Sequence, residues 1–188
     1  MPKFACGIDE VGRGALAGPL VVASVVFKSY KNIPKNIKDS KQTTHSFRQK
    51  LFRSILNTAY IGTGWVDAIM IDKIGISEAT KIAIEKSIVN NISRKDIILL
   101  DGNIKPYSNH KIFSIVRGDC NYVSIAAASI VAKFIRDNIM ILKCLKYPIY
   151  KWEKNKGYGT KDHLLAIKLY GITEIHRKTY KMCYNKEY

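Results

Sequence analysis

The hydrophobic and polar positions of this chain follow two alternating periods. Short apolar runs, bounded by polar or glycine-containing segments, predict buried β-strands at about 3–9, 19–28, 60–66, 97–100 and 111–116. Apolar residues spaced three and four apart predict helices that begin at Thr44, Ser77, Ser124 and Thr160. A basic polar loop at 29–42 joins the second strand to the first helix. This alternation predicts an α/β fold.

Three of the hydroxyl residues at the expected helix starts are candidate N-caps. We expect Thr44, Ser77 and Thr160 to be N-caps, because a hydroxyl oxygen can accept a hydrogen bond from a free amide of the first turn. The helices from Ser77, Ser124 and Thr160 are expected to end near 92, 146 and 169. The apolar stripes of the first two helices are Phe47, Leu51 and Ile55, and Ile84, Ile88 and Ile92.

Charge favours a polyanionic partner. The 188 residues include 31 Lys and Arg against 15 Asp and Glu, a formal net charge of +16. Nucleic acid is the favoured partner, ahead of an anionic membrane surface. Lysines spread over a solvated surface, as AT-rich codon usage produces, are the alternative. With 47% hydrophobic residues and no repeat or low-complexity linker, the chain can bury the core of a single domain.

Several function classes lack the pattern they require. No signal peptide and no apolar run of about 20 residues is present, so we expect a cytoplasmic protein that does not enter a membrane. The cysteines have no C-x-x-C spacing and read as reduced, mostly buried thiols, and the histidines have no metal-ligand spacing. These residues are Cys6, Cys120, Cys144 and Cys183, and His45, His110, His163 and His176.

The stretch Asp9-Glu-Val-Gly-Arg-Gly14 carries the strongest chemical signal. Two carboxylates at a strand end can bind metal ions, and a glycine turn around Arg13 lets backbone approach a ligand closely. A solvated turn is the alternative, although apolar strands flank the stretch on both sides. The glycine spacing also approaches a phosphate-binding loop. That reading fails because Arg13 and Gly14 stand where Lys and Ser or Thr are needed.

Two further acids follow predicted strands. Asp101 comes after the strand at 97–100, and Asp119 comes after the strand at 111–116. Ligand sites of α/β proteins gather at the carboxyl ends of strands, so we expect both to meet Asp9 and Glu10 in one pocket. Carboxylates at contact distance repel one another, and bound Mg²⁺ or Mn²⁺ would relieve this repulsion. The alternatives are an ordinary Asp-Gly turn at Asp101 and a helix cap at Asp119.

Several short motifs follow one another along the chain, each occurring once. They are Gly7-Ile-Asp-Glu-Val-Gly-Arg-Gly14 with Leu16-Ala-Gly-Pro19, Asp39-Ser-Lys41, Leu100-Asp-Gly102, Gly118-Asp119, Ser124-Ile-Ala-Ala-Ala-Ser-Ile-Val-Ala-Lys133 with Arg136-Asp137, Lys156-Gly-Tyr-Gly-Thr160 and Ile175-His-Arg177. In order and spacing, from about residue 5 to residue 177, they resemble bacterial ribonuclease HII, the type 2 ribonuclease H.

This resemblance implies a ribonuclease H-like fold, with a mixed central sheet flanked by helices. It implies one catalytic domain over 1–188, with a helical segment at about 145–188 completing the substrate groove. The implied reaction is a metal-dependent cut on the 5′ side of ribonucleotides, in RNA/DNA hybrids and at single ribonucleotides in duplex DNA. The products carry 3′-hydroxyl and 5′-phosphate ends, and two divalent ions, Mg²⁺ or Mn²⁺, would activate the attacking water. We expect the enzyme to act as a monomer.

The resemblance also assigns roles to individual positions. Asp9, Glu10, Asp101 and Asp119 match the metal-binding carboxylates. The turn of Gly12, Arg13 and Gly14 matches the segment that reads the ribose 2′-hydroxyl, Tyr158 matches the aromatic residue that stacks on the adjacent deoxyribose, and Lys41 matches a phosphate contact. Without the resemblance, Gly-Tyr-Gly at 157–159 would read as a surface turn.

Two basic residues of the long helix, Lys133 and Arg136, lie one turn apart. We interpret them as phosphate contacts, with solvated surface positions as the alternative. The chain departs from the family pattern after Asp119, where Cys120, Asn121 and Tyr122 replace a small residue, Lys and Ser, and at Gly159, which replaces Ala. We expect substrate grip, rather than catalysis, to differ there.

Two rival hypotheses remain. Charge alone would suit a non-catalytic RNA-binding protein, against which the acidic cluster argues. The second is the paralogous ribonuclease HIII, which would carry an additional N-terminal substrate-binding domain. Only eight residues precede Asp9, so we expect that domain to be absent.

Overall fold

A five-stranded mixed sheet forms the centre of the computed structural model, which describes residues 5–37, 44–88 and 96–184. The strand order is β3-β2-β1-β4-β5. The three N-terminal strands pair antiparallel, whereas β4 is parallel to both β1 and β5. The strands are β1 (Cys6–Val11), β2 (Leu20–Phe27), β3 (Ala59–Val66), β4 (Ile97–Asp101) and β5 (Lys111–Ile115).

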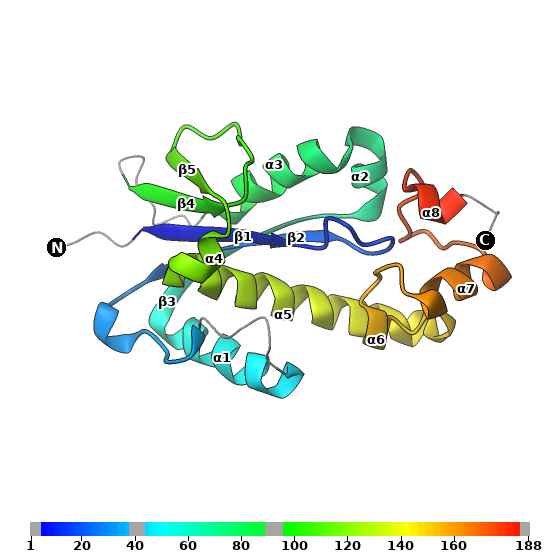
Figure 1. Cartoon of the computed structure of the whole chain (residues 1–188), viewed down its shortest axis with the longest axis horizontal. Helices are drawn as coiled ribbons and strands as arrows, with labels where there is room; N and C mark the ends of the chain where they lie inside the picture. Colours follow the sequence, from blue (N-terminus) through cyan, green and yellow to red (C-terminus); the bar gives the residue numbers. More distant parts are fainter. Residues whose placement is uncertain (1–4, 38–43, 89–95, 185–188) are drawn as a thin grey trace.

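Helices cover both faces of this sheet (Figure 1). One face carries α1 (His45–Thr58) and the long α5 (Val123–Lys146), and the other carries α2 (Ala68–Ile74) and α3 (Ile76–Ser87). The remaining helices are α4 (Gly118–Asn121), α6 (Trp152–Asn155), α7 (Lys161–Tyr170) and α8 (Lys181–Tyr184), with 3₁₀ turns at Tyr30–Asn32 and Pro148–Tyr150. The mixed α/β fold expected from the sequence is confirmed. No helix in the described ranges has the length and apolar character needed to cross a membrane.

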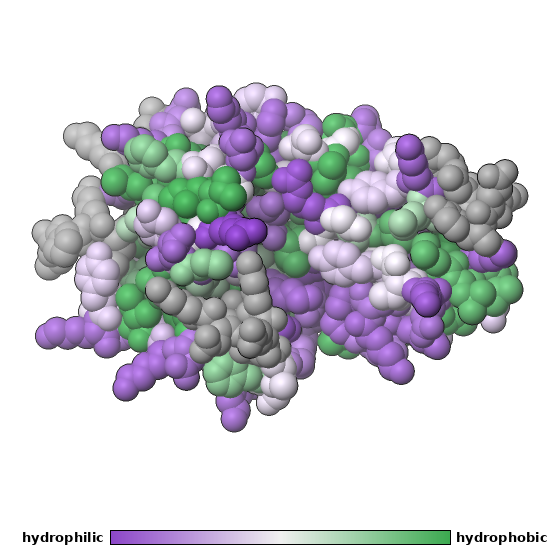
Figure 2. Space-filling model, in the orientation of Figure 1, coloured by the Kyte–Doolittle hydropathy of each residue, from purple (hydrophilic) through white to green (hydrophobic). Residues whose placement is uncertain are grey.

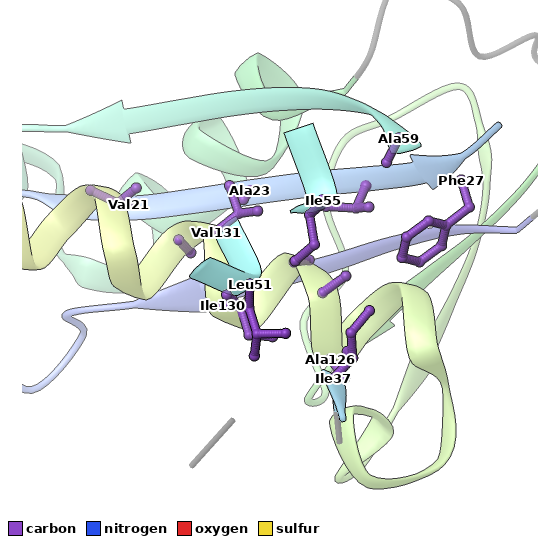
Figure 3. Close-up of a cluster of buried hydrophobic side chains, with 14 residues drawn as sticks. Val21, Ala23, Phe27, Ile37, Leu51, Ile55, Ala59, Ala126, Ile130 and Val131 are labelled. Atoms are coloured by element: carbon purple, nitrogen blue, oxygen red, sulfur yellow. The ribbon is translucent and has the colours of Figure 1, made fainter. Parts of the chain in front are cut away.

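The first core cluster lies between the sheet and the α1–α5 layer. Val21, Ala23 and Phe27 of β2 pack there against Leu51 and Ile55 of α1 and the alanine-rich start of α5 (Figure 3). A second cluster between the sheet and α3 includes Ile8, Ile84 and Leu100, each fully buried. Burying side chains on both faces explains the nearly continuous apolar runs of β2 and β4.

A close approach of β1 to α5 fixes the position of the acidic stretch. A Cβ atom on Gly7 would lie 2.1 Å from the carbonyl carbon of Ser124, so only glycine fits there. The N-terminal part of α5 therefore lies directly against β1. Asp9 and Glu10 sit two and three residues beyond this contact.

Most predicted elements are confirmed, including the caps at Thr44 and Thr160, whose hydroxyls accept hydrogen bonds from Phe47 N and His163 N. The prediction that Ser77 is an N-cap is wrong. Gly75, at φ +81°, ends α2 and precedes α3, so Ser77 lies inside the first turn of α3. Helix α2 was not predicted from the sequence, and Asp67 caps it by accepting a 2.8 Å hydrogen bond from Met70 N. Helix α3 ends at Ser87, and Ile92 lies outside the described residues.

Candidate active site

Three carboxylates come together where β1 and β4 run side by side. Asp9 and Glu10 lie within β1 rather than at the strand end expected from the sequence, because pairing continues to Val11. Asp101 is the last residue of the adjacent parallel strand β4. The Asp9 side chain accepts a hydrogen bond from Glu10 N at 2.8 Å and is almost completely buried.

Burial and mutual repulsion set the electrostatics of this cluster. The pKa of Asp9 is raised to about 7, mainly by burial and also by the charges of Glu10 and Asp101, while a hydrogen bond from Ser129 of α5 acts in the opposite direction. The pKa of Glu10 is also raised, first by burial, and Asp101 adds to the shift. Asp9 and Glu10 are therefore held where ionising both of them together is unfavourable.

Glu10 is only partly neutralised by its neighbour. Its Oε1 atom lies 3.5 Å from Nη1 of Arg13, whose side chain is 40% exposed. Its Oε2 atom is buried and has no hydrogen-bond partner among the described residues. An ionised oxygen without a partner is costly to bury, so this atom indicates a cation-binding position.

The fourth acid, Asp119, lies in the short helix α4 and is buried. Arg117 precedes α4 with a left-handed backbone, φ 55° and ψ 41°, which turns the chain sharply after β5. The amide of Gly118 then donates a 2.7 Å hydrogen bond to Oδ1 of Asp101, which ties the start of α4 to β4. Asp119 does not cap α5, because Tyr122 holds the cap position of that helix.

These residues suit a hard divalent cation. All four side chains supply carboxylate oxygens, the ligands preferred by Mg²⁺ and Mn²⁺, and Glu10 Oε2 is a buried oxygen in need of a cation. Across the part of the chain that the structure describes, no three acidic, histidine or cysteine side chains already form a metal-holding group. Binding would therefore require the carboxylate side chains to turn toward the ion.

Two buried arginines, Arg136 and Arg177, contact the turn that follows β1. Gly12 has φ +95°, and a Cβ there would lie 2.2 Å from Nε of Arg136. The carbonyl of Arg13 accepts hydrogen bonds from Arg177 Nη1 at 2.8 Å and from the hydroxyl of Tyr180 at 2.7 Å. A Cβ on Gly14, in contrast, would meet nothing within 4 Å. Packing therefore demands glycine at position 12 but not at position 14.

This turn is joined directly to the loop that carries Tyr158. The amides of Leu16 and Ala17 both donate to the carbonyl of Gly157, at 2.8 and 3.2 Å. Arg136 strengthens the junction by donating to Ala17 O and to Lys156 O. Its guanidinium carbon lies 5.2 Å from the centre of the Tyr158 ring. The two segments expected to read sugars are thus one connected unit.

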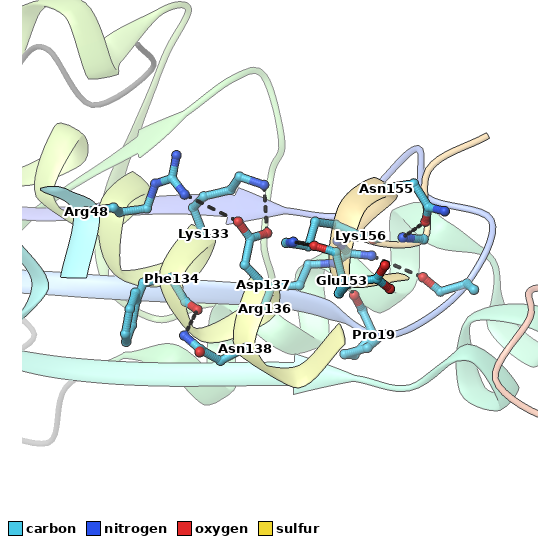
Figure 4. A network of polar contacts seen from close by, with 12 residues as sticks. Pro19, Arg48, Lys133, Phe134, Arg136, Asp137, Asn138, Glu153, Asn155 and Lys156 are labelled. Atoms are coloured by element: carbon cyan, nitrogen blue, oxygen red, sulfur yellow. Dashed lines mark hydrogen bonds and ion pairs between the residues drawn. The ribbon is translucent and has the colours of Figure 1, made fainter. Parts of the chain in front are cut away.

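The expected phosphate contact at Arg136 is wrong. Its side chain is fully buried, and its donors are directed to the carbonyls of Pro19, Ala17 and Lys156 (Figure 4). Burial lowers the pKa of Arg136 to about 10. A guanidinium so enclosed by backbone holds the loop together and cannot reach a phosphate.

Lys133 is more accessible, with one third of its side chain exposed. Its ammonium lies 2.7 Å from Asp137 Oδ1, and Arg48 of α1 lies 3.3 Å from the other oxygen of that carboxylate (Figure 4). Buried Asp137 therefore positions two cations from different helices. A phosphate contact at Lys133 remains a prediction, and Lys41 lies outside the described residues.

Several residues of this region carried no individual prediction. Ser129, Asp137, Arg177 and Tyr180 contact or support it from α5 and the C-terminal segment. The motif Ile175-His-Arg177 was the available signal for Arg177, but a motif does not show which carbonyl an arginine holds.

Three of the four cysteines are buried and Cys120 is exposed, which agrees with the prediction that the thiols are mostly buried. In Figure 2, hydrophilic residues gather near the middle of the face on which α4 lies.

Known structures share this fold. A ribonuclease HII from Archaeoglobus fulgidus, solved in complex with PCNA, superposes with a TM-score of 0.82 at 24% identity, covering 95% of each chain. A Bst ribonuclease HIII solved with Mn²⁺ superposes with a TM-score of 0.75 at 18% identity, covering 96% of this chain and 68% of the other. At these identities both comparisons establish the fold alone.

Sequence comparison defines the family. The family model described as Ribonuclease HII matches residues 6–184. Ribonuclease HII from the Wolbachia of Brugia malayi is 48% identical over 174 residues, which cover 93% of this chain and 86% of the relative. A non-catalytic RNA-binding protein is thereby excluded, and the identity favours type HII over type HIII. This chain belongs to the ribonuclease HII family and is a ribonuclease H enzyme.

Proposed function

We propose that this enzyme cuts on the 5′ side of ribonucleotides, both in RNA/DNA hybrids and at single ribonucleotides embedded in duplex DNA. The products would carry 3′-hydroxyl and 5′-phosphate ends. The observation that carries the proposal is the continuity of the site. The acidic strand β1 runs directly into the Gly12–Gly14 turn, and Leu16 and Ala17, which follow this turn, are hydrogen-bonded to Gly157 of the loop bearing Tyr158. Chemistry and sugar recognition are thus fixed relative to each other.

The carboxylates of Asp9, Glu10, Asp101 and Asp119 would hold two divalent cations, Mg²⁺ or Mn²⁺. Bound cations would supply the Lewis acid that activates water and stabilises the departing 3′-oxygen. The protein's part is to hold these side chains near one another, with Gly118 N fixing Asp101 and Ser129 facing Asp9. Neutralising the repelling carboxylates is one source of cation affinity.

Substrate choice would come from the turn and the tyrosine. The open space beside Gly14 lets backbone approach a sugar, where a 2′-hydroxyl can accept or donate a hydrogen bond. The Tyr158 ring is partly exposed, and a flat ring packed on a sugar accommodates a 2′-hydrogen better than a 2′-hydroxyl. Together they would select a ribonucleotide followed by DNA.

The net charge of +16 supports binding to a nucleic acid backbone. Lys133, and Lys41 by family position, would contact phosphates. Action as a monomer in the cytoplasm, in the excision of misincorporated ribonucleotides, completes the proposal.

A cleavage assay tests the proposal. Duplex DNA with one ribonucleotide, and an RNA/DNA hybrid of the same sequence, are incubated with the protein with and without Mg²⁺ or Mn²⁺. We expect metal-dependent cutting of both and a 5′-phosphate on the ribonucleotide-containing product. An intact single-ribonucleotide strand would overturn the substrate assignment.

Two variants separate chemistry from recognition. Asp9→Asn should abolish cleavage while retaining duplex binding. Tyr158→Ala should slow cutting at a single ribonucleotide much more than cutting of the hybrid. Tyr170→Ala, at an exposed tyrosine of α7, is the matched control and should behave like the unmodified protein. Normal cutting by both site variants would refute the residue assignment.

A further inference from the structure

Two buried histidines form a hydrogen-bonded pair beneath the Tyr158 loop. His163 on α7 and His176 in the C-terminal segment are both almost fully inaccessible, and their Nε2 atoms lie 3.1 Å apart. The indole Nε1 of buried Trp152 lies 3.1 Å from the same nitrogen of His163. Tyr150 packs on this group, with its ring 4.9 Å from that of His176.

The hydrogen-bond partners at the two ends of this series of hydrogen bonds determine which ring nitrogens carry protons. The amide of Thr173 can only donate, so the His176 Nδ1 atom, 2.9 Å away, accepts. The carbonyl of Tyr158 can only accept, so the His163 Nδ1 atom, also 2.9 Å away, donates. His176 is then protonated on Nε2 and donates to the bare Nε2 of His163, which also accepts from Trp152. Every nitrogen is satisfied only when both rings are neutral.

The last acceptor in this series of hydrogen bonds is the backbone carbonyl of Tyr158, the residue that we assign to substrate stacking. The carbonyl of Tyr158 is bound by His163 from below, while Arg136 lies against the Tyr158 ring. The preceding carbonyls, of Lys156 and Gly157, are held by Arg136 and by the amides of Leu16 and Ala17. The Tyr158 carbonyl also accepts a 2.8 Å hydrogen bond from the amide of Thr160, so His163 supplies the side-chain part of the attachment that fixes the loop on its C-terminal side.

We propose that the neutral His176–His163 pair is a positioning device for Tyr158, holding its backbone so that the ring meets the sugar of the nucleotide next to the cut. This inference rests on the proposed function. It adds two positioning residues that touch neither the substrate nor the metal-binding carboxylates.

The surroundings of the pair keep both rings neutral. Burial lowers the pKa of His163, and burial together with the charge of a protonated His163 lowers the pKa of His176 to about 4. The facing charged group is Glu174, which favours protonation of His176 but is itself bound by Lys146 and the Tyr147 hydroxyl. An additional proton on either ring would set two donors against each other.

Nuclear magnetic resonance of the whole protein tests the arrangement without any substrate. The chain has four histidines, so ¹⁵N side-chain spectra can be assigned with single variants. We expect His163 protonated on Nδ1 and His176 on Nε2 at pH 7, with His176 still neutral at pH 5.5. The opposite tautomers, or a cationic ring at pH 7, would overturn the proposal.

A double-mutant cycle tests the link to Tyr158. His163→Phe keeps a ring but removes the donor, and should lower kcat/KM for single-ribonucleotide DNA about tenfold. In the Tyr158→Ala background the same change should have no further effect, because no ring is left to position. His163→Asn, whose amide can still donate near the Nδ1 position, should retain most of the activity.

The outcomes are distinguishable. A merely structural histidine would lower activity equally in both backgrounds, and that additivity would overturn the positioning role. If the unmodified protein fails to cut single-ribonucleotide DNA, the proposed function fails. The pair is then tested by the tautomers and by a shift of the Tyr158 ring signals in His163→Phe, and unchanged ring signals would overturn it.

Discussion

The guanidinium of Arg136 lies 5.2 Å from the centre of the Tyr158 ring while its nitrogens donate to the carbonyls of Pro19, Ala17 and Lys156. One buried side chain thus joins the segment after the glycine turn to the tyrosine loop. This relationship makes Arg136 part of the scaffold of substrate recognition.

Arg136→Met should destabilise the protein by about 3 kcal/mol or more, because it leaves buried carbonyls without donors. Urea unfolding followed by circular dichroism measures the change. Lys143→Met, at an exposed position of the same helix, is the matched control and should cost less than about 1 kcal/mol. Equal effects of the two substitutions would contradict the scaffold role.

Gly12→Ala and Gly14→Ala should separate folding from function. Alanine at position 12 must adopt φ +95° with its Cβ against Arg136, and should cost about 2 kcal/mol or more. Alanine at position 14 meets open space, so stability should change by less than about 1 kcal/mol while cleavage falls. Thermal unfolding and the single-ribonucleotide assay measure the two effects. Full activity of Gly14→Ala would remove position 14 from the sugar-reading surface.

Asp9→Asn should stabilise the protein in the absence of metal and abolish stabilisation by Mn²⁺. The substitution removes a buried charge beside Glu10 and Asp101, a gain of about 1–4 kcal/mol. Thermal unfolding with chelator and with added Mn²⁺ measures both effects. Asp162→Asn, at an exposed acid paired with Lys151, should leave both unchanged. A metal-free Asp9→Asn protein less stable than the unmodified one would contradict the repulsive cluster.

His176 should make folding sensitive to mild acid. Its folded pKa of about 4 lies below the ordinary 6.5, so between these values the unfolded chain binds a proton that the folded protein excludes. Stability is complete above pH 6.5 and falls as the pH decreases toward 4, by about 2 kcal/mol at pH 5. The free energies of unfolding of the unmodified protein and of His176→Phe should lie closer together at pH 5 than at pH 7.5, because only the unmodified protein loses stability through His176. A pH-independent difference between them would refute this contribution.

The sequence alone predicted most of the secondary structure and the chemical class of the site. Continuous apolar runs identified β2 and β4, because strands buried on both faces need no polar alternation. Threonine caps located the starts of α1 and α7, because capping is a local interaction. The motif order around Asp9 and Asp101 gave the family, which comparison with relatives confirmed.

Local rules failed where neighbouring elements compete. Ser77 has the chemistry of a cap, but the positive φ of Gly75, between α2 and α3, starts the helix earlier. Sequence spacing does not show that two helices are separated by a single glycine turn. Arg136 was expected at a phosphate because it is basic and one turn from Lys133, although only Lys133 is accessible.

The tertiary structure decided which partner each polar group meets. Arg136 donates to the carbonyl of Ala17, 119 residues away in the sequence, and Arg177 donates to the carbonyl of Arg13, 164 residues away, so their roles depend on carbonyls that the fold brings to them. A buried donor is stable only with an acceptor in reach, and chain folding alone determines that acceptor. The sequence determined the family and the metal-binding acids, whereas long-range packing determined what holds the sugar-reading turn and Tyr158 in place.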